Sequence, residues 1–251
     1  MAGAGLKGAL ISFMPSFVGA LPNVVVFQIN PESITHTWTP AAPPEPPTPT
    51  GQPAHPPPPP EPLAVRGLPG ETFGFTLALD ANDEIADAAR NPPAAAIASV
   101  TGVYARLAAL EMLQYPLAAA GAGLLGTVSA SISASGISVS VGGPSGTDAS
   151  VPRMQVPVVL FVWGPQRIVP VRVTGLTITE KLYDSALNPV HADVQITLRV
   201  LTPDEMVQIK GPMKTIANAA YTYTQGLRQV QATANLGAAA GAILGMLPTP
   251  F

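Results

Sequence analysis

The sequence predicts an α+β protein that is mainly β, with a helix flanking the sheet and a helical C-terminal extension. Apolar and polar residues alternate with a period of two in several segments, which is typical of strands with one buried face. Apolar residues recur at intervals of three and four in residues 94–115 and in residues 203–247, which is typical of amphipathic helices. A proline-rich segment and a glycine- and serine-rich segment interrupt the predicted β domain.

The first predicted strands lie in residues 24–38 and 71–79. A β-branched and aromatic run precedes Asn30-Pro31, which breaks it, and Ile34, His36 and Trp38 then alternate with threonines. Residues 71–79 alternate phenylalanine or leucine with smaller side chains, which indicates one buried face.

The proline-rich segment covers residues 40–62. It contains more than a third of the 30 prolines, five of them consecutive at positions 56–60. Proline fixes φ and lacks an amide donor, so the segment is expected to be an exposed polyproline linker or loop. Two interpretations stay open: an inert spacer inserted into a hairpin, or a ligand for a proline-binding groove.

A short acidic run follows the strand at 71–79, with carboxylates at Asp80, Asp83, Glu84 and Asp87. The run lacks the glycine and the final glutamate of a calcium-binding loop. We therefore interpret the carboxylates as the start of a short helix, where the helix dipole favours negative charge. One amphipathic helix is expected next, over residues 94–115, ended by Pro116.

The second half of the chain predicts a meander of three strands. Residues 117–151 are nearly uncharged and carry a weak hairpin pattern, and strands follow over residues 156–163, 168–182 and 190–201. The expected domains are an N-terminal extension (1–23), a β domain (24–201, with insertions at 40–62 and 117–151) and a helical extension (202–251). The period-two positions predict a core of Phe73, Phe75, Leu77, Val159, Phe161, Trp163, Val173, Ile178, Ile196 and Leu198.

Composition excludes several classes of function. The absence of cysteine excludes a disulfide scaffold, thiol catalysis and thiolate metal sites. A net charge of −3 gives no basic surface for nucleic acid, and we expect no membrane-spanning helix. Only 11% of residues are charged, so much of the surface is expected to be covered by partners.

No motif for chemistry is complete. The histidines are His36, His55 and His191, and His55 lies among prolines. Ser185, His191 and Asp193 are close in sequence but lack a nucleophile turn, and the fragments at 3–5 and 121–123 lack the third glycine of a dinucleotide loop. We therefore expect no catalytic, cofactor-binding or metal-binding residues, no cofactor, and a protein that is not an enzyme.

Four blocks in order carry a family resemblance. They are FQINPES at 27–33, FTLALD at 75–80, PVVLFVWG at 157–164, and LYD at 182–184 with NPVHADV at 188–194. Together they resemble the contractile injection system tube-protein family, the tube-initiator or baseplate hub proteins of extracellular, phage-tail-like particles. The sequence departs from the family where His191 replaces the usual arginine, and no peptidoglycan-binding LysM module follows the β domain.

The resemblance implies a tail-tube-like β-barrel or sandwich assembled as a hexameric ring. Its implied partners are the inner tube protein, the spike protein and other baseplate proteins, with assembly in the cytoplasm before release in an extracellular particle. A ring subunit buries its sides and faces against neighbours, which suits a chain so poor in charge. The alternative function is a non-catalytic peptide- or glycan-binding module with a proline-rich linker.

Overall fold

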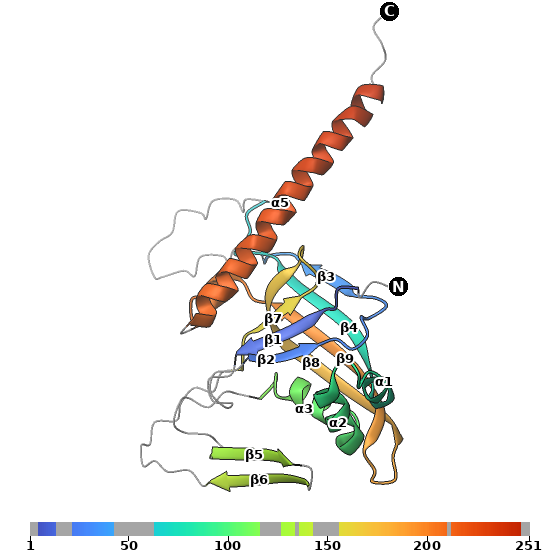
Figure 1. Ribbon diagram of the computed structural model, residues 1–251. Coiled ribbons are helices and arrows are strands. Elements are labelled where there is room, and N and C mark those ends of the chain that lie inside the picture. The colour runs from blue at the N-terminus through green and yellow to red at the C-terminus, as the bar shows by residue number, and fades with distance from the viewer. Residues whose placement is uncertain are drawn as a thin grey trace, which may run out of the picture.

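The computed structural model describes residues 5–13, 22–42, 63–115, 127–133, 136–142, 156–209 and 212–246. Its body is a seven-stranded antiparallel sheet with the order β2-β1-β7-β8-β9-β4-β3 (Figure 1). The expected α+β, mainly β class is confirmed. The strands of this sheet are β1 (Ala9–Phe13), β2 (Pro22–Val26), β3 (Thr35–Thr39), β4 (Gly70–Asp80), β7 (Val159–Val162), β8 (Ile168–Tyr183) and β9 (Pro189–Val200).

The sheet is strongly curled. The rings of Phe161 on β7 and Phe75 on β4 lie 5.5 Å apart, although β8 and β9 separate these strands in the sheet. Strands three positions apart in a flat sheet would lie about 14 Å apart. The inward faces of β7 and β4 therefore meet and enclose one core. The predicted core residues are buried there, except Trp163 and Ile178, which are partly buried and pack against it.

A side-chain amide connects the segment after β2 to the end of β4. Strand β3 pairs only with residues 70–74 of β4, which leaves the far end of β4 without a strand on that side. Gln28 covers this end: its Nε2 donates to the carbonyl of Asp80 at 2.7 Å, and its Oε1 accepts from the Asp80 amide at 3.0 Å. Strands β2 and β3 do not pair with each other in the part of the chain that the structure describes.

Strand β8 keeps both of its halves in the core through a bulge. The register against β9 shifts between Val173 and Gly175. Before the shift odd-numbered residues such as Val173 face inward, and after it Leu176 and Ile178 do so. The extra residue bends the strand.

Three short helices pack at one end of the sheet: α1 (Ala81–Ala86), α2 (Pro92–Thr101) and α3 (Tyr104–Glu111). The single helix expected over residues 94–115 is wrong, because α2 and α3 meet at an angle of 96°. Gly102 makes this bend with a φ of +57°, and the amide of Val103 donates to the carbonyl of Pro189 at 2.9 Å. A Cβ on Gly102 would lie 2.3 Å from the same carbonyl oxygen, so only glycine fits.

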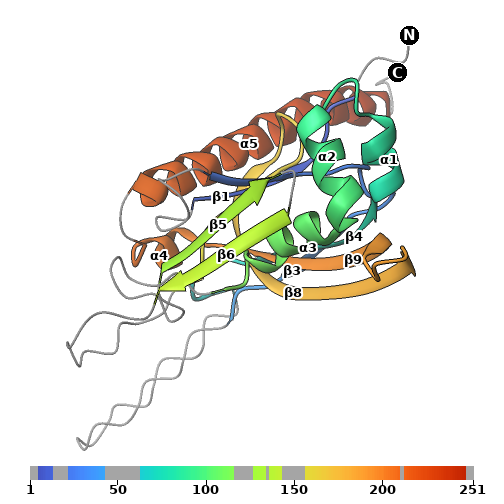
Figure 2. The ribbon, with the colours of Figure 1, turned by 60° about the horizontal axis from the view of Figure 1, so that its bottom comes forward.

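The C-terminal extension forms α4 (Pro203–Met206) and α5 (Pro212–Met246). Thr202 and Glu205 form a capping box on α4, and Glu205 also accepts from Arg199. Helix α5 packs on β8 with its N-terminal half and then extends beyond the sheet (Figures 1 and 2), with residues 229–237 all exposed. Among the described helices, no single one is long and apolar enough to span a membrane.

Two segments complete the fold. Residues 9–13, within the predicted N-terminal extension, form β1, which lies between β2 and β7 in the sheet. The weak hairpin expected in residues 117–151 is confirmed as β5 (Thr127–Ser133) paired with β6 (Gly136–Gly142), a two-stranded sheet separate from the first (Figure 2). The rest of that insertion and residues 43–62 lie outside the described residues.

Candidate functional site

A buried carboxylate lies where α5 crosses the sheet. Glu71, near the start of β4, is 4% exposed and stands in the same inward phase as Phe73. Its carboxylate accepts from Arg228 of α5 in a two-pronged contact, one arm of which measures 3.0 Å, and from His36 Nε2 at 2.8 Å. A carboxylate this buried is costly unless it is paired and hydrogen-bonded, and here both conditions hold.

Aromatic rings surround this ion pair. The guanidinium of Arg228 lies 5.0 Å from the centroid of the Trp38 ring, and that of Arg167 lies 5.1 Å from the centroid of Phe73. The His36 ring stacks on Phe73 at 4.4 Å. Burial, and then repulsion from Arg228, lower the pKa of Arg167, and Glu71 opposes this shift. Two guanidinium groups thus stand beside one carboxylate, which leaves the junction with a surplus of positive charge.

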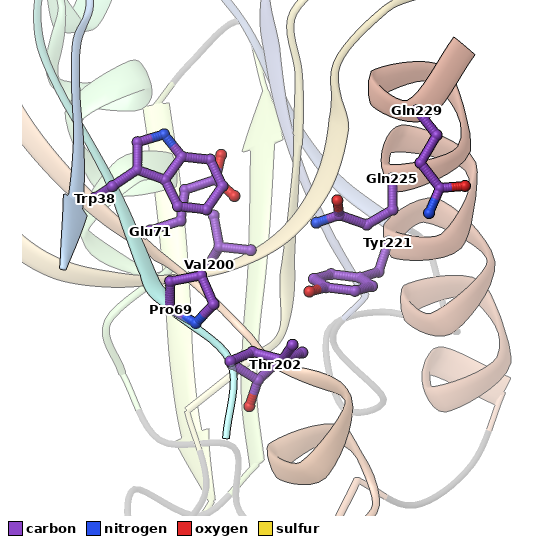
Figure 3. A pocket seen from close by; sticks show the side chains of 9 residues that line it. Trp38, Pro69, Glu71, Val200, Thr202, Tyr221, Gln225 and Gln229 are labelled. Carbon is purple, nitrogen blue, oxygen red and sulfur yellow. The ribbon is translucent and has the colours of Figure 1, made fainter. Parts of the chain in front are cut away.

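A groove opens beside the cluster, between the ends of β3, β4 and β9 and the first half of α5. It has a volume of about 300 Å³. Figure 3 shows Trp38 and Glu71 on the sheet side, with Tyr221, Gln225 and Gln229 facing them from α5. Leu68, Pro69, Val200 and Thr202 complete the lining. A groove of aromatic and apolar side chains with a few polar groups is a usual form of ligand site. This junction is the candidate functional site.

Several hydrogen-bonding groups in the groove have no partner within the described part of the chain. Thr202 is engaged with Glu205. By contrast, the indole N–H of Trp38, the hydroxyl of Tyr221 and the side-chain amides of Gln225 and Gln229 have no hydrogen-bond partner among the described residues. The groove therefore offers donors to a ligand without first breaking an internal bond.

A second polar cluster lies on the outer face of the sheet. His191 on β9 places Nδ1 3.4 Å from Asp80 and Nε2 3.4 Å from Asp193, and Lys181 on β8 pairs with Asp193. The hydrogen bond from Lys181 is the main cause that lowers the pKa of Asp193. The structure thus brings His191 and Asp193 together, but Ser185, in the β8–β9 turn, makes no hydrogen bond to either.

Asp80, Asp83 and Glu84 of the acidic run lie at the start of α1, as expected, whereas Asp87 is the C-terminal cap of this helix. The Asp80 side chain accepts from the amide of Asn82 and caps α1, while Glu84 pairs with Arg106 and Asp87 with Arg90. Arg106 also donates to the carbonyl of Val26 at 3.1 Å, so it ties α3 to the outer edge of β2. The described residues contain no group of three side chains arranged to hold a metal ion.

One feature of the sequence indicates the junction, although it was not among the predicted sites. Glu71 occupies an inward position of a strand whose other inward residues are apolar, and an inward carboxylate needs partners from elsewhere in the chain. Arg228 is 157 residues away, so nothing local indicates that pairing. His55 and residues 121–123 lie outside the described part of the chain.

No protein-family model matches the sequence, and no curated protein matches it.

Proposed function

We propose that the chain is a structural subunit that assembles into a homo-oligomeric ring, most simply a hexamer, in a contractile injection system. In this role it is the tube initiator or hub that connects the spike to the inner tube. The proposal rests on the four ordered sequence blocks together with surfaces that the isolated chain leaves open.

The β5–β6 hairpin is the observation that carries the proposal. Its two strands pair only with each other in the described structure, and neither contains a charged residue. A lone two-stranded hairpin is at best marginally stable in water. In the part of the chain that the structure describes, each strand also has an unpaired edge without the charges that normally prevent edge-to-edge pairing. Pairing with a neighbouring subunit would satisfy both edges.

The main sheet also ends in open strands. At one edge β3 exposes Trp38, and at the other β2 exposes Val24 and Val26. Beyond the groove, α5 exposes Val230 and Leu236. These residues lie on separate parts of the molecule, as the several contacts of a ring subunit require.

The test is the assembly state of hairpin variants. Ser129 and Ser140 lie directly opposite each other in the hairpin. Replacing both with proline removes ladder hydrogen bonds, whereas replacing both with threonine keeps strand propensity. Light scattering and electron microscopy should show rings for the wild-type chain and the threonine variant, and folded smaller species for the proline variant. A monomeric wild-type chain at high concentration would contradict ring assembly.

The injection-system assignment needs its own test. When co-expressed with the inner tube protein and the spike protein of a contractile injection system, the chain should co-purify with both, and the threonine variant should do the same. If the chain formed rings that bind neither partner, the ring assembly would be supported but the hub role would be excluded.

The groove at the α5 junction favours the second candidate, a non-catalytic peptide-binding module. Trp38 and Tyr221 supply aromatic surface, and Gln225 and Gln229 supply hydrogen-bonding groups. Binding of an unrelated peptide by a chain that stays monomeric would favour this candidate over the ring subunit.

A further inference from the structure

The groove at the α5 junction lies beside both ends of the proline-rich segment. Trp38, which lines the groove, is four residues before Ala42, and Leu68 and Pro69 follow closely after Arg66. The amide of Arg66 donates to the carbonyl of Ala42 at 2.7 Å, so the chain leaves and returns at one point. The 20 residues between Ala42 and Leu63 are therefore tethered at both ends next to the groove.

The composition of the segment complements the groove. Residues 43–62 contain 12 prolines, whose carbonyl oxygens accept hydrogen bonds but which have no amide donors of their own. The donors on Trp38, Tyr221, Gln225 and Gln229 have no partner among the residues that the structure describes, and aromatic rings are the usual surface for polyproline II ligands. The segment carries Glu45 and Glu61 with no lysine or arginine, whereas the junction has a positive surplus.

We propose that the groove binds the chain's own polyproline stretch, residues 53–62, in the polyproline II conformation. The length of the segment allows this within one chain. The four residues from Ala42 to Trp38 cover about 14 Å of extended strand. Ten residues of polyproline II cover about 31 Å, so the stretch reaches the groove and lies along it. Because the prolines are already restricted, binding costs little conformational entropy.

The experiment compares two proteins with one synthetic peptide. In the first protein a Gly/Ser sequence of equal length replaces residues 43–62, and the second is the full chain. The peptide comprises residues 51–62, and a control peptide carries alanine at positions 56–60. The sequence has two tryptophans, so the readout is the indole N–H signal of Trp38 by NMR, with Trp163 beside Phe27 in the core as the internal control.

We expect the peptide to shift the Trp38 signal of the loop-replaced protein and to leave that of Trp163 unchanged. The full chain should bind it at least tenfold more weakly, since a tether supplies an effective concentration on the order of 1 mM against a peptide Kd on the order of 0.1 mM. Gln225→Ala and Gln229→Ala should each weaken binding about twofold to tenfold. Gln195→Ala, an exposed position on the outer face of β9, should not change it.

Several outcomes would overturn the proposal. One is no shift of Trp38 at millimolar peptide, and another is equal binding of the alanine peptide, which would exclude polyproline recognition. Equal affinity for the full chain and the loop-replaced protein would show that the segment does not occupy the groove. If the Trp38 signal changed with protein concentration in the full chain but not in the loop-replaced protein, the occupant would come from a second copy and the intramolecular assignment would be wrong.

Discussion

Removing Arg228 should strongly destabilise the packing of α5 on the sheet, because the buried carboxylate of Glu71 would lose its charged partner. Glu71 is 4% exposed, and after Arg228→Met its one remaining direct partner among the described residues is His36. Removing one partner of a buried ion pair costs about 3–5 kcal/mol of stability. Because the Arg228 side chain is 27% exposed, we expect a loss at the lower end of this range, about 3 kcal/mol. For a chain of this size that loss lowers Tm by roughly 6–12 °C.

The assay is a double-mutant cycle by urea denaturation, followed by circular dichroism and tryptophan fluorescence. Glu71→Gln combined with Arg228→Met removes both charges, so the double variant should recover at least about 1 kcal/mol relative to the sum of the single variants. Arg172→Met, at an exposed position of β8, is the matched control and should change stability by less than about 0.5 kcal/mol. A coupling energy below about 0.5 kcal/mol would refute the view that Glu71 depends on Arg228.

Three further variants test the fold. Phe161→Asp should prevent folding, because it buries an unpaired charge in the centre of the core, and soluble expression of an assembled variant would contradict this. Gly102→Ala should cost roughly 2–3 kcal/mol through strain at positive φ and a clash with Pro189, measured by thermal denaturation, and an unchanged Tm would be inconsistent with the bend. Hydrogen bonds from the side chain and then from the amide of Asn188 hold the pKa of Asp184 below its ordinary value. These bonds therefore stabilise the turn fully at a pH above the ordinary pKa of an aspartate, and this stabilisation is lost as the pH falls through the lowered pKa. Asn188→Ala should raise the pKa of Asp184, which an NMR titration of its carboxyl carbon would detect.

The strands were predictable from the sequence because alternation is a local property. Inward phenylalanines in β4 and β7 mark the buried faces of these strands. The predicted core also contains Val173 and Ile178, which lie an odd number of residues apart, so both can face inward only if β8 contains a bulge between them. The short strand β1 was not predicted, because a five-residue, mostly apolar stretch near the N-terminus is equally compatible with several structures.

The features that were not predicted depend on contacts distant in sequence. The bend at Gly102 is fixed by the carbonyl of Pro189, and the end of β4 is hydrogen-bonded by Gln28, which is 52 residues away from Asp80. A helical periodicity of three and four continues through such a bend, so the pattern alone favours one long helix. The candidate site has the same origin, since Arg228 reaches Glu71 only because α5 crosses the end of β4.

The way α5 is held bears on the ring assembly that we propose. Ala217 and Tyr221 of α5 pack against apolar residues of the body. Hydrogen bonds add to this packing: Tyr223 donates to the carbonyl of Pro165 at 2.8 Å, Thr224 bonds both the amide and the carbonyl of Ile168, and Arg228 donates to Glu71. Apolar packing alone would tolerate rotation or sliding of the helix, whereas these bonds fix its register on the sheet. The exposed residues 229–237 beyond Arg228 are therefore presented at a defined position relative to the groove and the β3 edge. An arm oriented in this way suits repeated, identical contacts between subunits, so loss of Glu71–Arg228 pairing should impair ring assembly in variants whose sheet remains folded.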